Sequence, residues 1–81
     1  MTPYKDISSE IREFSQEVDE FELKWHRDLE DREVVALFET DWKVQLDNEL
    51  PVNLNSPVKI KAGTWHRVIK GTGNLVVKII K

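Results

Sequence analysis

Apolar and polar residues alternate along several short stretches of this chain, and turn-forming residues separate the stretches. Alternation or apolar enrichment occurs at residues 21–26, 42–47, 51–54, 58–60, 66–69 and 75–80. Residues 33–39 are almost continuously apolar, which is typical of a strand buried on both faces. Side-chain alternation with a period of two predicts strands, and short strands at this spacing predict an all-β sandwich or barrel.

The two ends of the chain need separate predictions. Residues 1–11 are polar, with a proline and a pair of serines, so we expect an irregular or helical lead-in before a single domain over residues 12–81. Alternation over residues 12–18 favours a strand, with a helix as the alternative. Near the other end, the Gly71-Thr72-Gly73 segment predicts a turn, and we expect residues 66–69 and 75–80 to form a hairpin about it.

The alternation also predicts which side chains form the core. Trp42, Val44 and Leu46 share one face of their predicted strand, and the simplest interpretation is a core face. Within residues 21–26, the apolar positions 21, 23 and 25 share a face opposite His26.

The composition limits the fold and the chemistry. A chain of 81 residues fits one domain with a thin core, and no cysteine provides a disulfide or a thiolate metal ligand. The first residues lack the apolar core of a signal peptide, and no apolar run reaches membrane-spanning length, so we expect a cytoplasmic protein that is not bound to a membrane. The small core and the three tryptophans lead us to expect a homodimer.

Charge is distributed unevenly along the chain. The formal net charge is −3, yet all 15 acidic residues precede Pro57, so that residues 1–56 carry −9 and residues 57–81 carry +6. Opposite charges on interleaved strands of one fold explain this simply. Six scattered cations in an acidic domain are a weak signal for nucleic acid, so we expect no nucleic-acid partner.

The chemistry that the sequence suggests centres on its two histidines. His26 and His66 each follow a tryptophan, and the carboxylates Asp28 and Glu33 lie shortly after the first histidine. Imidazole and carboxylate groups are ligands that first-row divalent metal ions accept. His26 and Asp28 are two residues apart, so on a strand they point to the same side of the sheet. The tryptophans are out of phase with the histidines and should face away from any pocket.

This pattern resembles the cupin superfamily of small jelly-roll β-barrels, whose first motif reads G-x5-H-x-H-x(3,4)-E-x6-G. In this chain Glu20 falls at the leading glycine and His26 at the first histidine. The second histidine, the glutamate and the final glycine of the motif correspond to Asp28, Glu33 and Thr40.

The second cupin motif, G-x5-P-x-G-x2-H-x3-N, aligns with the later part of the chain. Gly63 and His66 match, whereas Asn55, Lys61 and Lys70 replace the glycine, the proline and the asparagine. The resemblance covers roughly residues 12–81 and implies a cupin-type jelly-roll barrel whose interior gathers a set of metal ligands: His26, Asp28, Glu33 and His66.

A second register of the first motif remains open. It pairs Lys24 with His26 and uses Glu30 or Asp31 as the acid. The ammonium group of Lys24 would then enter the pocket and oppose metal binding.

Three functions are compatible with these patterns. The first is a barrel that binds Mn, Fe, Ni or Zn and a small polar ligand, with or without catalysis. The second is a metal-free binding or sensory module, and the third is a structural barrel that mainly forms a dimer. The sequence does not select a reaction.

Overall fold

The computed structural model describes residues 3–81, and nearly all of their regular secondary structure is β-strand. The elements are β1 (Lys5–Asp6), β2 (Ile11–Phe14), the single-turn 3-10 helix η1 (Glu20–Glu22), β3 (Arg32–Ala36), β4 (Lys43–Leu46), β5 (Val52–Asn53), β6 (Val58–Ile60), β7 (His66–Ile69) and β8 (Leu75–Ile80). The all-β prediction is therefore confirmed. No helix among the described residues is long and apolar enough to cross a membrane.

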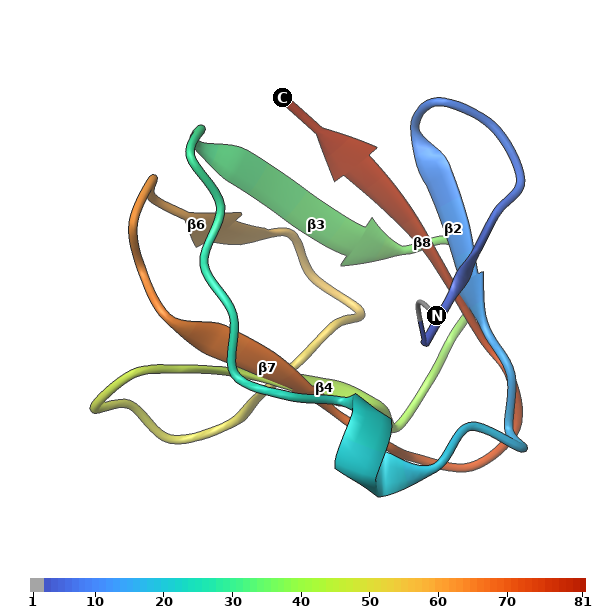
Figure 1. Ribbon diagram of the computed structural model, residues 1–81. Helices are drawn as coiled ribbons and strands as arrows, with labels where there is room; N and C mark the ends of the chain where they lie inside the picture. Colours follow the sequence, from blue (N-terminus) through green and yellow to red (C-terminus); the bar gives the residue numbers. More distant parts are fainter. Residues whose placement is uncertain (1–2) are drawn as a thin grey trace.

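The strands form two antiparallel sheets rather than one closed barrel. The larger sheet has the order β1-β2-β8-β3-β6, and the smaller has the order β5-β4-β7 (Figure 1). Because the two sheets remain separate, the expectation of a closed barrel is wrong, and the architecture is an open two-sheet sandwich. The segment between η1 and β3 runs from one sheet to the other along the side of the sandwich (Figure 1).

The beginning of the chain is more ordered than expected. The predicted lead-in over residues 1–11 contains β1 and the first residue of β2, although residues 1 and 2 lie outside the described residues. β1 pairs with β2, and β2 pairs with β8, so this segment belongs to the larger sheet. The predicted strand over residues 12–18 is shorter, because β2 ends at Phe14.

The predicted terminal hairpin is wrong. β7 pairs with β4 in the smaller sheet, whereas β8 lies between β2 and β3 in the larger one. Residues 70–74 therefore cross between sheets. The backbone N–H and the hydroxyl of Thr72 donate to the Asp41 carboxylate at 2.7 and 2.9 Å, which fixes the crossover to the chain before β4.

The core lies between the two sheets. Trp42, Val44, Leu54 and Leu75 are buried almost completely. The Trp42 indole N–H donates to the Gly73 carbonyl oxygen at 3.0 Å, so the largest core side chain also has its one polar group satisfied. The predicted core face of residues 42, 44 and 46 is confirmed, with Leu46 partly buried.

Residues 21–26 do not form the predicted strand. The Asp19 carboxylate accepts a hydrogen bond from the Phe21 N–H at 2.9 Å. This bond caps the 3-10 helix η1, which forms where we expected extended backbone. Leu23 is buried, but Phe21 is 85% exposed and Trp25 is 40% exposed, so these three side chains do not share a buried face. Within residues 21–26, only His26 takes part in β pairing, through an isolated antiparallel bridge to His66.

The orientation predicted for β3 is also wrong. The ligand set required Glu33 to point into the interior, yet Val34 and Ala36 are the residues of β3 that pack on the core. A strand that is apolar on both faces carries no alternation to fix its phase, so the sequence left this choice open.

Candidate metal centre

The two histidines are brought together by backbone pairing. The N–H of His26 donates to the carbonyl oxygen of His66 at 2.9 Å, and the N–H of His66 donates to that of His26 at 2.8 Å. Residues paired directly across an antiparallel bridge project their side chains to the same face. The imidazole ring centroids lie 4.2 Å apart as a result.

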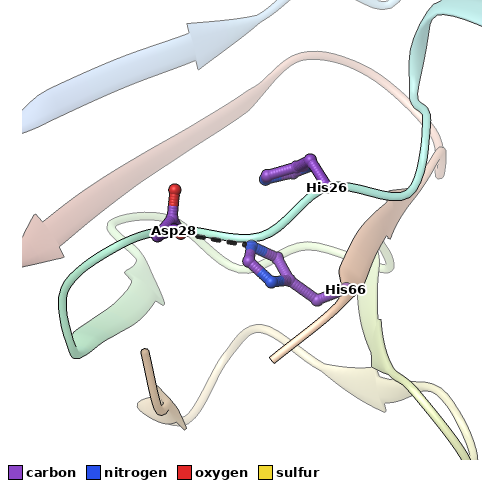
Figure 2. Close-up of side chains that lie close together, drawn as sticks. All are labelled: His26, Asp28 and His66. Atoms are coloured by element: carbon purple, nitrogen blue, oxygen red, sulfur yellow. Dashed lines mark ion pairs between the residues drawn. The ribbon is translucent and has the colours of Figure 1, made fainter. Parts of the chain in front are cut away.

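Asp28 completes a compact group with the two rings (Figure 2). It lies two residues after His26 in the segment between η1 and β3, and its own carbonyl oxygen accepts a hydrogen bond from the Gly63 N–H at 2.8 Å. Its Oδ2 atom is 3.4 Å from Nε2 of His66. One potential ligand atom from each of the three residues lies within 4.8 Å of the others, so this group could hold a metal ion.

Local hydrogen bonds orient both imidazole rings in the same way. Nδ1 of His26 is 3.1 Å from the carbonyl oxygen of Lys24, and Nδ1 of His66 is 2.8 Å from that of Thr64. A carbonyl oxygen only accepts, so each Nδ1 donates its proton. In the neutral rings this leaves the lone pair on Nε2, the usual arrangement when a backbone carbonyl orients a metal-binding histidine.

Burial has the largest effect on the pKa of His66. Only 4% of the residue is exposed, and this burial is the main cause that lowers its pKa below the ordinary value of 6.5. The hydrogen bond to Thr64 and the negative charge of Asp28 partly oppose this shift, while His26 and Arg32 lower the pKa further. The neutral ring then presents a lone pair toward the Asp28 carboxylate, and a cation between two acceptors would satisfy both.

The three side chains line a cavity between the sheets. Its volume is about 400 Å³, which is within the range of small-molecule sites. Core side chains including Val44, Leu54 and Leu75 form its apolar part. Lys24 also lines the cavity, as expected from its phase with His26, and it is exposed.

The structure does not bring Glu33 into this group. Its neighbours Arg32 and Val34 line the cavity, and since side chains alternate along a strand, Glu33 points the other way. The acids of the second register are not in the group either, because Asp31 accepts a hydrogen bond from the Ala62 N–H at 2.8 Å and Glu30 is exposed.

The two tryptophans face away from the cavity, as their phase predicts. Trp25 and Trp65 are 40% and 44% exposed, and neither lines the cavity. The guanidinium of Arg67 lies 4.9 Å from the Trp25 ring centroid, and that of Arg27 lies 5.1 Å from the Trp65 ring. These two cation–π contacts cover the outer side of the histidine bridge.

We did not identify two features of the site from the sequence. The tripeptide Trp-His-Arg occurs twice, at residues 25–27 and 65–67, and its two copies pair antiparallel so that each tryptophan meets the arginine of the other copy. This repeat was a readable signal that the two segments are partners. Arg32 was also missed, since nothing in its sequence setting distinguishes it from a surface cation.

Comparisons of the chain with protein-family models, with curated proteins and with solved structures give no match.

Proposed function

We propose that this domain binds a divalent transition-metal ion through His26, Asp28 and His66, beside a cavity that receives a small-molecule ligand. The observation that carries the proposal is the convergence of two oriented imidazoles and one carboxylate within 4.8 Å. Two histidines and one carboxylate suit zinc or iron, and the same ligands are compatible with manganese or nickel.

The distances support a shared ion. Metal–ligand bonds of about 2.0–2.2 Å mean that two ligand atoms on opposite sides of one ion are at most about 4.4 Å apart. Oδ2 of Asp28 and Nε2 of His66 are already 3.4 Å apart, and all three donors lie within 4.8 Å, so side-chain movement of about an ångström closes the set around a tetrahedral ion. The paired backbone hydrogen bonds fix the main chain at both histidines.

Three protein ligands leave coordination positions for water or a ligand atom, as in catalytic rather than structural metal sites. A bound divalent ion would act as a Lewis acid toward an oxygen atom of the ligand. The Lys24 and Thr64 carbonyls would keep the rings oriented. The apolar side chains of the cavity would exclude water from the part of the ligand that does not reach the metal.

The relationship to the cupin superfamily belongs to this proposal. Motif spacing supports it, as does a group of two histidines, one buried and one exposed, that lines a cavity between two antiparallel sheets. The altered ligand set, with Asp28 at a histidine position, would make this a divergent member. We further propose that the protein acts as a homodimer in the cytoplasm, on the grounds of small size and absence of cysteine.

The experiment is a titration of the chelator-treated protein with Zn²⁺, Mn²⁺, Fe²⁺ and Ni²⁺ by calorimetry. We expect one ion per chain for at least one metal. Asp28→Asn should weaken its binding by more than the roughly 10- to 100-fold that loss of an outer hydrogen-bonding partner costs. Glu33→Gln is the matched control, because it removes a carboxylate of β3 that lies outside the group, and it should bind metal like the natural chain.

Circular dichroism of each variant verifies that it is folded. Equal metal affinities of the Asp28→Asn and Glu33→Gln variants would contradict the proposed ligand set. Failure of the natural chain to bind any of the four metals stoichiometrically would contradict the metal centre altogether.

A further inference from the structure

Arg32 places an unusual positive charge inside the cavity. It lines the cavity from β3, and its side chain is only 19% exposed. The Nε atom is buried and has no hydrogen-bond acceptor among the described residues. Its nearest carboxylate oxygen, Oδ2 of Asp28, is 3.8 Å away, which is beyond hydrogen-bonding distance.

A buried guanidinium donor without an acceptor is costly. Leaving one such donor unsatisfied costs more for a charged group than for a neutral one, so the site favours an occupant that supplies an acceptor. The second arginine that lines the cavity differs, because Nε of Arg12 donates to Asp6 at 3.1 Å and its guanidinium lies over the Tyr4 ring. Of the two arginines that line the cavity, Arg32 is therefore the one with a buried donor that no acceptor satisfies, although it lies near the charge of Asp28.

A metal ion at the neighbouring group would strengthen this preference. The ion would bind the Asp28 carboxylate, which is the nearest anion to Arg32, and would neutralise its negative charge. The metal, Asp28 and Arg32 would together carry an excess of positive charge in a partly buried place. Such a place favours an anion, and a planar carboxylate fits a guanidinium with two parallel hydrogen bonds.

The remainder of the cavity is apolar. Val34, Val68 and Ile79 line it with part of their surface free, and they pack on the fully buried core side chains beneath them. A hydrated or many-hydroxyl ligand would leave polar groups unpaired against these side chains. A ligand with one charged end and a hydrocarbon remainder would satisfy both parts of the cavity.

We infer that the cavity binds a small amphipathic monocarboxylate, with its carboxylate on Arg32 beside the metal centre and its hydrocarbon part against the apolar side chains between the sheets. This inference rests on the proposed function for the neighbouring metal, and it adds the ligand class and the residue that selects it.

The test titrates the zinc-loaded full chain with hexanoate and with hexan-1-ol, which carries the same hydrocarbon without a charge. Binding is followed by NMR through the methyl signals of Val34, Val68 and Ile79, which line the cavity with part of their surface free. Hexanoate should bind at least about tenfold more tightly than hexan-1-ol, since a charge-assisted hydrogen bond contributes on the order of a tenfold to hundredfold gain in affinity.

Two variants assign the effect to the residue. Arg32→Gln should lower hexanoate affinity about tenfold or more, leave hexan-1-ol affinity unchanged and leave zinc affinity unchanged or higher, because a cation beside Asp28 is removed. Arg27→Gln is the matched control, since it removes an arginine on the outer face, and it should change none of these affinities. If Arg32→Gln does not fold, Arg32→Lys replaces it, and several-fold weaker hexanoate binding is expected.

The outcomes separate the two proposals. Normal zinc binding with hexanoate no tighter than hexan-1-ol, or equal hexanoate affinity in the two arginine variants, overturns the carboxylate inference and leaves the metal centre standing. Arg32→Lys binding hexanoate like the natural chain overturns the role of the guanidinium. No zinc binding, together with Arg32-dependent hexanoate binding, overturns the metal centre and supports the carboxylate site.

Discussion

Gly71→Ala tests how tightly the crossover between the sheets is packed. A Cβ atom built at Gly71 would lie 2.7 Å from the backbone N of Trp42 and would also collide with Oδ1 of Asp41. Ordinary contacts of this kind begin near 3.4 Å, so the backbone must move by more than half an ångström. Overpacking of this kind costs about 1–3 kcal/mol, and a weakened bond between Asp41 and Thr72 adds about 1 kcal/mol.

The comparison variant is Gly73→Ala, two residues later in the same crossover. Its backbone has φ +72° and a Cβ there would meet nothing within 4 Å, so its cost is the left-handed conformation alone, roughly 1–2 kcal/mol. We expect Gly71→Ala to lose about 2–4 kcal/mol in urea unfolding, with Tm lower by roughly 10–25 °C for a domain of this size. A Gly71→Ala variant that is as stable as Gly73→Ala would refute the packing at this crossover.

Three further predictions concern acid stability, the core and assembly. Thr72 hydrogen bonds lower the pKa of Asp41 from its ordinary 3.8, so this carboxylate stabilises the fold above that value and the gain is lost as pH falls below it; Asp41→Asn should flatten this part of an acid unfolding curve. Trp42→Phe removes the indole donor to Gly73 and leaves a void, so chemical denaturation should show a loss of roughly 1–3 kcal/mol, and an unchanged midpoint would count against this account. Sedimentation equilibrium should give twice the 9.5 kDa chain mass, whereas a monomer mass at every concentration would exclude the homodimer.

The strands that the sequence predicted best are those with clear boundaries. Residues 58–60, 66–69 and 75–80 coincide with β6, β7 and β8, because turn-forming residues flank each apolar run. Their partners were harder to predict. The glycines of residues 71–73 indicate a turn, but they do not state which strands it joins. The contact of Thr72 with Asp41, 31 residues away in sequence, decides that the chain crosses to the other sheet.

The candidate site shows the same division between local and long-range information. The spacing of His26 and Asp28 predicted that they point the same way, since that follows from two residues of extended chain. The sequence placed both Asp28 and Glu33 in the ligand set, and only the phase of β3 in the fold shows that Glu33 lies outside the group. Arg32 became visible only because its surroundings in the fold provide no hydrogen-bond acceptor for Nε.

The most direct test of the central claim is X-ray absorption of the zinc-loaded protein. We predict a spectrum with imidazole ligands at about 2.0–2.1 Å, two per zinc, together with oxygen ligands from Asp28 and solvent. The imidazole signal should fall by half in His26→Ala. A zinc environment made of oxygen ligands alone, or one that His26→Ala leaves unchanged, would contradict the metal centre between the two sheets.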